Sequence, residues 1–202
     1  GNHCYARAMS RTLFGLLTAG LLLVTVPAAA RTLVVNANGY TFDSRGELIR
    51  FDRLQIGDDG RVEATYKPGD SLPKGLVLTR QVEAGGRTLI PGLIDAHADV
   101  MGLGLAALAE RTMPPPGPRR EEMALAAALR TLGSMGVTMV HDQGTRPDAW
   151  TLYRRFGDEG RLTARIYAVA ADPEALARIA PLRPTPWLYQ DRLVLRAVRF
   201  FA

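Results

Sequence analysis

The chain has 202 residues, 47% hydrophobic and 22% charged, a composition typical of a globular protein with one or two domains. Its net charge of +5 includes Arg7 and Arg11 from the first thirty residues, and no basic run is interleaved with aromatic residues. These features argue against nucleic-acid binding. Cys4 is the only cysteine, which excludes an intramolecular disulfide.

Residues 9–30 have the organisation of a cleavable signal peptide. Arg11 supplies a positive start, residues 13–26 form an apolar run, and three alanines follow Pro27. The apolar run is shorter than the about 20 residues that a membrane-spanning helix needs. We therefore expect a periplasmic or secreted protein with no stable membrane anchor, and we treat residues 1–8 as upstream sequence.

Residues 31–88 have the pattern of a small β domain, built from short apolar or alternating runs. The stretch GDDGR (57–61) is typical of a tight turn, and Val62, Ala64 and Tyr66 share one face of the strand after it. The pair Gly85-Gly86 predicts a second turn followed by a returning strand. We expect a β-sandwich-like N-terminal unit.

From residue 89 the pattern changes to alternating strands and helices, which favours an α/β fold with a parallel sheet. Strands are predicted at 89–97, 137–142, 162–170 and 192–202. Helices are predicted at 121–135, 148–156 and after Asp172, with Asp148 and Asp172 as the capping residues of the last two. A complete (β/α)8 TIM barrel needs about 250 residues. Residues 89–202 therefore predict a partial barrel of about four strands.

A buried strand is predicted within TLIPGLIDAHADVMGLG (88–104), and it ends in His97-Ala98-Asp99. Because alternate residues of a strand point to the same side, His97 and Asp99 can reach one metal ion. A catalytic zinc site uses three protein ligands, and a carboxylate can serve as one of them, as a histidine can. His141 becomes a third candidate if the strand ends converge. The alternatives are a structural histidine at His141 and a solvated carboxylate at Asp99.

The block GRTLIPGLIDAHADVMGLG resembles the signature of the amidohydrolase superfamily, PG-(L/F)-ID-x-H-x-H. LVVNANGYTFD, IGDDGRVEA and MGVTMVHDQGT are similar to the branch of N-substituted formamide deformylases, and the resemblance covers nearly the whole chain from Thr32. It implies a metal-dependent hydrolase of non-peptide carbon–nitrogen bonds. It also implies a divalent metal, zinc above all, and a small amide-like substrate. His97 falls on the first metal-ligand position.

The chain departs from this family pattern in several places. Asp99 stands where the second histidine is expected, and Arg199 stands where the family often has a lysine that can be carbamylated. By the resemblance, Asp95 orients backbone or a neighbouring ligand rather than binding metal. The family also has a long segment between the first barrel strand and MPPPGP (113–118), so the resemblance implies internal deletion and truncation.

Two readings of function remain open from the sequence. In the first, the chain is an amidohydrolase-type protein that is inactive as a fragment and that holds a divalent metal weakly or not at all. In the second, it is a non-catalytic periplasmic binding or interaction module that self-associates through open sheet edges. The product of a pseudogene or of an assembly artefact is a further alternative.

Overall fold

A computed structural model describes residues 31–110 and 113–200 of the chain. The predicted signal peptide (9–30) and Cys4 lie outside these residues. The described chain divides into two compact units, one of residues 31–39 and 50–88 and one of residues 40–49 and 89–200. Among the described residues, no helix has the length and apolar character needed to cross a membrane.

The first unit is built on a four-stranded sheet with the order β5-β4-β1-β6. Its strands are β1 (Arg31–Val35), β4 (Arg53–Ile56), β5 (Val62–Tyr66) and β6 (Leu78–Glu83). The short strands β2 (Asn38–Phe42), β3 (Leu48–Phe51) and β7 (Thr88–Leu89) form a second sheet with the order β3-β2-β7. The described part of residues 31–88 is thus β-rich, as the alternating runs predict.

The two turns predicted in this region have different outcomes. The first is confirmed, because β4 and β5 pair antiparallel and the Gly57 amide donates to the Arg61 carbonyl at 2.9 Å. The second was expected to return the chain onto the preceding strand, which is wrong: β6 pairs with β1, and β7 belongs to the sheet of β2. The Gly86 amide instead donates to the carbonyl of Asn36, which holds this turn beside the β1–β2 connection.

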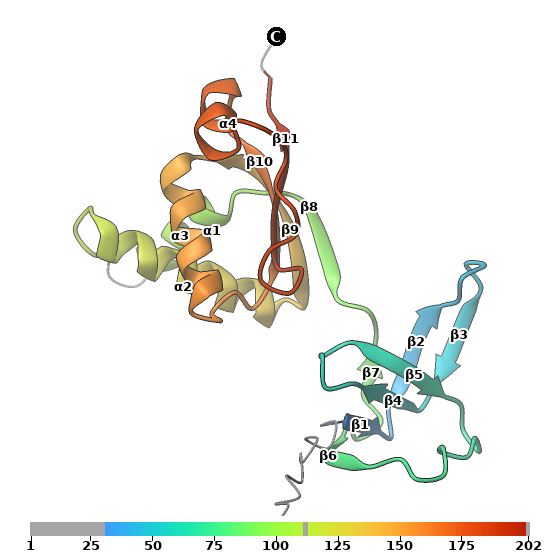
Figure 1. The fold of residues 1–202 in the computed structure, drawn as a ribbon. Coiled ribbons are helices and arrows are strands. Elements are labelled where there is room, and N and C mark those ends of the chain that lie inside the picture. Colours follow the sequence, from blue (N-terminus) through green and yellow to red (C-terminus); the bar gives the residue numbers. More distant parts are fainter. Residues whose placement is uncertain (1–30, 111–112, 201–202) are drawn as a thin grey trace, which may run out of the picture. The chain divides into compact units, whose positions relative to one another are not determined.

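The second unit contains a parallel sheet with the order β11-β10-β9-β8. Its strands are β8 (Leu93–Ala98), β9 (Val137–Thr145), β10 (Arg165–Ala170) and β11 (Leu193–Val198). Its helices are α1 (Val100–Ala109), α2 (Pro118–Ser134), α3 (Pro147–Asp158) and α4 (Pro173–Ile179), which lie on one side of the sheet (Figure 1). The expectation of about four parallel strands is confirmed.

Strand β8 differs from its prediction as a buried strand. The side chains of Leu93 and Ile94 are 52% and 62% exposed. The physical reason is position, since β8 is an edge strand of the sheet. A run of apolar residues indicates a buried strand only when neighbours cover both faces.

Two helices begin at a proline that the sequence pattern did not mark as their first residue. Helix α4 is confirmed with its cap, because the Asp172 carboxylate accepts from the Ala175 amide at 2.7 Å. The prediction that Asp148 caps α3 is wrong, since Arg146 is the N-cap and Pro147 the first helical residue. Helix α2 also begins at a proline, Pro118, three residues before its predicted start. Proline suits the first helical position because its missing amide would be unpaired there anyway.

The core lies between the sheet and the helices. Val140, Ile166 and Leu195 are fully buried on the strands, against a helical layer that includes Leu125 and Phe156. Helices α1 and α2 approach each other closely, because a Cβ on Gly104 would lie 2.0 Å from the Ala124 carbonyl oxygen. This contact fixes the amino-terminal half of α2 relative to α1.

Candidate active site at the carboxyl end of the parallel sheet

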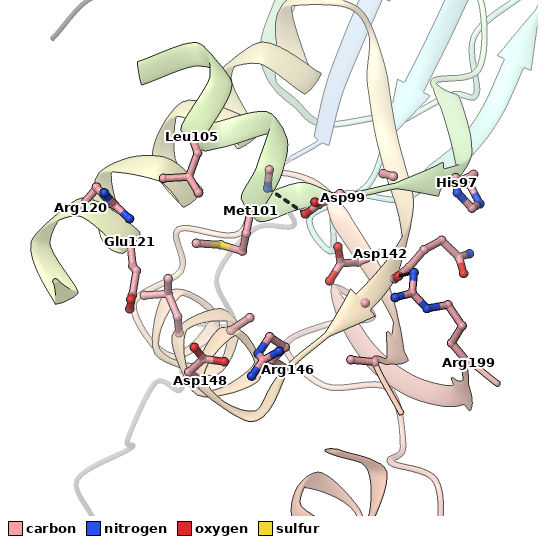
Figure 2. Close-up of a pocket in the computed structure, with 17 residues that line it drawn as sticks. His97, Asp99, Met101, Leu105, Arg120, Glu121, Asp142, Arg146, Asp148 and Arg199 are labelled. Atoms are coloured by element: carbon pink, nitrogen blue, oxygen red, sulfur yellow. Dashed lines mark hydrogen bonds between the residues drawn. The ribbon is translucent and has the colours of Figure 1, made fainter. Parts of the chain in front are cut away.

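A cavity of about 690 Å³ lies where β8 and β9 end and α1 and α3 begin (Figure 2). Carboxyl ends of parallel strands meet at one edge of a sheet, and α/β enzymes place their active sites there. Helix α2 precedes β9 and runs back toward it, so its first turn lies at the same edge. Residues from all of these elements line the cavity, among them His97, Asp99, Arg120, Asp142 and Arg146.

Asp142 forms a buried polar junction beneath the cavity. Its side chain is only 3% exposed, and one carboxylate oxygen accepts from the Val100 amide at 3.0 Å. The other oxygen accepts from the hydroxyls of Thr145 at 2.6 Å and Tyr153 at 3.0 Å. Burial raises the pKa of Asp142, although these three hydrogen bonds favour its charged form. The carboxylate therefore joins β9 to the start of α1 and to the middle of α3.

Tyr153 is the fully buried partner of this junction. Burial and the neighbouring Asp142 raise the pKa of the Tyr153 hydroxyl well above its ordinary value. The phenol therefore stays protonated and acts as a fixed hydrogen-bond donor. The sequence alone did not identify this pair. The available signal was that Asp142 follows His141 on a strand and must therefore face the opposite side of the sheet.

Asp99 and Asp95 hold the end of β8 in place. Asp99 is the N-cap of α1, and its carboxylate accepts from the Gly102 amide at 2.8 Å, as the dashed line in Figure 2 shows. The Asp95 carboxylate accepts from the backbone amide of His97 at 3.0 Å. The His97 side chain is exposed and lines the cavity. His97 and Asp99 thus line one cavity, and one carboxylate oxygen of Asp99 is engaged in capping α1.

The third candidate ligand lies elsewhere. The His141 ring stacks on the Tyr167 ring, with centroids 4.7 Å apart and an interplanar angle of 25°. The two residues are register partners on β9 and β10, and His141 is absent from the cavity lining. Asp142, next in sequence, points into the helical layer. Within residues 31–110 and 113–200, no group of three or more histidine, cysteine or carboxylate side chains is arranged to hold a metal ion.

Three arginines line the cavity, and the sequence analysis singled out only one of them. Arg199 donates from Nη1 to the Gln143 carbonyl at 2.9 Å. Arg120 lies in the first turn of α2 and is half-buried, whereas Arg146 is the exposed N-cap of α3. The proline-containing starts of both helices were the available signal for the last two, because they place these residues at the sheet's carboxyl edge.

The fold of this chain is found in solved metal-dependent hydrolases. An uncharacterized metal-dependent hydrolase from Pyrococcus horikoshii OT3 matches with a TM-score of 0.60 at 13% identity, over 84% of this chain and 54% of that one. Its counterpart from Pyrococcus furiosus matches with a TM-score of 0.62 at 14% identity, over 84% and 56%. Ochratoxinase from A. niger matches with a TM-score of 0.51 at 19% identity, over 70% and 31%.

These likenesses place the chain in a structural class. It has a mixed α/β fold and spans about half the length of the two Pyrococcus proteins, which is consistent with part of a barrel. At these identities the match concerns the fold. No protein-family model matches the sequence, and no curated protein sequence matches it.

Proposed function

We propose that this chain forms the substrate-binding edge of a metal-dependent hydrolase of amide-like, non-peptide carbon–nitrogen bonds. The observation that carries the proposal is the cavity at the carboxyl end of the parallel sheet, which contains the candidate ligands His97 and Asp99. The fold likeness to metal-dependent hydrolases, together with the PG-LIDAH block before this cavity, supports it.

The described residues do not complete a site for the metal. His97 supplies one imidazole, Asp99 uses a carboxylate oxygen to cap α1, and His141 lies at Tyr167. A catalytic zinc ion requires three protein ligands and an open position. Arg199 carries a guanidinium group, which cannot be carbamylated as a lysine amine can. We therefore propose that the chain alone does not hydrolyse amides, and that catalysis requires ligands beyond those described.

An assay of amide hydrolysis tests this proposal. The purified chain is incubated with N-substituted formamides and simple amides, with zinc, manganese or cobalt added, beside the His97→Ala variant. The expected result is no metal-dependent turnover by either protein. Turnover by the unmodified chain that disappears in His97→Ala would show a working metal site and contradict the proposed incompleteness.

The second candidate function is ligand binding without catalysis. The observation that favours it is the set of cavity arginines, which are suited to holding a ligand whether or not a metal is present. In this case the chain acts as a periplasmic binding module, as the predicted signal peptide suggests. Binding in the absence of any turnover, measured with the same amides, would support this alternative.

A further inference from the structure

We propose that the cavity recognises amides that carry a carboxylate, and that Arg120 is the residue that binds this carboxylate. The inference rests on the proposed function for the amide part of the ligand. It goes beyond that function by giving the ligand a negative charge and naming Arg120 as the residue that contacts it. Its observations are the bonding of Arg120, the state of the cavity carboxylates, and the convergence of helix starts at one edge of the sheet.

Arg120 lines the cavity and has one unmet hydrogen-bond donor. Its Nε is buried and has no hydrogen-bond partner among the described residues, while the side chain lines the cavity. A buried donor without an acceptor destabilises a protein by about 1–3 kcal/mol, so native structures usually satisfy such groups. A guanidinium group pairs best with a carboxylate, which can accept two parallel hydrogen bonds from it.

Two of the cavity's own carboxylates are already engaged. Asp142 accepts from the Val100 amide and two hydroxyls, and Asp99 accepts from the Gly102 amide. Neither forms an ion pair with Arg120 in the described structure. The guanidinium group of Arg120, which lines the cavity and has no ion-pair partner among the described residues, can therefore pair with an anion that enters.

The starts of α2 and α3 add to this preference. Their N-caps, Gly117 and Arg146, make no side-chain capping hydrogen bond, so the first-turn amides have no side-chain acceptor. The amino end of a helix carries partial positive charge that favours anions. Figure 2 shows Arg120 on one side of the cavity and Arg146 on another.

The remaining carboxylates explain why the ligand is an amide acid rather than a simple anion. Glu121 and Asp148 lie in the first turns of α2 and α3 and also line the cavity. They can accept from a ligand N–H group, whereas a ligand made only of anionic groups would be repelled by them. The volume of about 690 Å³ lies within the range of small-molecule sites. An N-acylated amino acid combines the carboxylate and the amide N–H.

Calorimetric titration of the full chain tests the proposal with a matched pair of probes. N-benzoylglycine carries the carboxylate, and N-benzoylglycinamide has nearly the same shape without the charge. We expect the unmodified chain to bind the acid at least about tenfold more tightly than the amide, the size of effect typical of a charged hydrogen bond. Equal affinity for the two probes, or no detectable binding of the acid, would overturn the proposal.

Variants on one helix then locate the contact. Arg120→Gln should reduce the affinity for N-benzoylglycine about tenfold and leave that for N-benzoylglycinamide unchanged, while Arg120→Lys should have an intermediate effect because it keeps charge but loses the planar fork. Arg130→Gln, which removes an exposed arginine near the other end of α2, is the control and should have no effect. Retained acid affinity in a folded Arg120→Gln protein would refute the assignment. These titrations measure binding without metal or turnover. Their result can therefore be interpreted even if the hydrolase proposal fails.

Discussion

Asp142 connects three elements through one buried carboxylate. Its partners are a backbone amide of α1 and the hydroxyls of Thr145 and Tyr153. Removal of the carboxylate leaves these buried donors without their acceptor. The residue therefore positions the edge of the cavity, although its neighbour His141 was the more conspicuous residue in the sequence.

The first prediction concerns the stability that this junction provides. Asp142→Ala should lower the free energy of unfolding by about 2–3 kcal/mol, because several buried donors lose their acceptor together. Urea unfolding followed by circular dichroism measures the change. Asp148→Ala, which removes an exposed first-turn carboxylate of α3, is the control and should change stability by less than about 1 kcal/mol. Equal effects of the two substitutions would contradict the role given to Asp142.

The second prediction concerns pH. The pKa of Asp142 is raised in the folded protein, so between the unfolded carboxyl pKa of about 3.9 and the raised folded value the folded state binds more protons. Stability from this group is therefore fully present below that window and is lost as the pH rises through it. The lowered pKa values of Glu63 and Glu122 act in the opposite direction, so the measurement is the difference between the unmodified chain and Asp142→Asn.

That difference should change across the acidic window in a definite direction. Relative to Asp142→Asn, the unmodified chain should lose stability as the pH rises from about 4 toward neutrality. Thermal unfolding at a series of pH values supplies the two curves. Parallel curves for the two proteins would show that the protonation of Asp142 is not coupled to folding.

At the scale of elements, α1 and α2 form a closely packed pair that presents Arg120 and Asp99 to the cavity. Helix α1 was not predicted, because MGLGLAALA has two glycines and no polar residue to mark a helical stripe. Its formation depends on the Asp99 cap and on contact with α2, neither of which is visible in a local pattern. Helix α2 was predictable because Leu125, Leu129 and Leu132 follow the helical period, and all three are buried.

The third prediction tests this helix contact. Gly104→Ala should destabilise the chain by about 1–3 kcal/mol, since the new methyl group would collide with the Ala124 backbone and force the helices apart. Gly133→Ala is the matched control, because a Cβ there meets nothing within 4 Å and alanine is the better helix former. The control should be neutral or up to about 1 kcal/mol more stable. The same sign for both variants, measured by urea unfolding, would be inconsistent with this packing.

At the scale of the whole molecule, the sequence patterns predict the β-rich region before residue 89 and the four parallel strands after it. Strand and helix periods are local properties, so they can be read from neighbouring residues. The sequence patterns could not predict that Arg120, Arg146 and Asp142 meet at one cavity. That meeting depends on which helices begin at the same edge of the sheet. The absence of His141 from the cavity is of the same kind, since His141 instead stacks on Tyr167, its register partner on the neighbouring strand.

The fourth prediction concerns the exposed apolar edge of the sheet. Leu93 and Ile94 lie on the edge strand β8 with more than half of each side chain exposed. Exposed apolar edge strands promote association between chains. We therefore expect concentration-dependent self-association in size-exclusion chromatography with light scattering, and a shift toward monomer in Ile94→Lys. A monodisperse monomer at all concentrations would show that the edge has no such effect.

The central claim is that, within residues 31–110 and 113–200, His97 and Asp99 are not joined by the further ligands that a catalytic metal needs. Zinc titration of the purified chain by calorimetry, with bound metal counted by elemental analysis, tests it most directly. We expect weak uptake of less than one zinc per chain, with little change in His97→Ala. Tight binding of one zinc per chain that is abolished by His97→Ala would contradict the account.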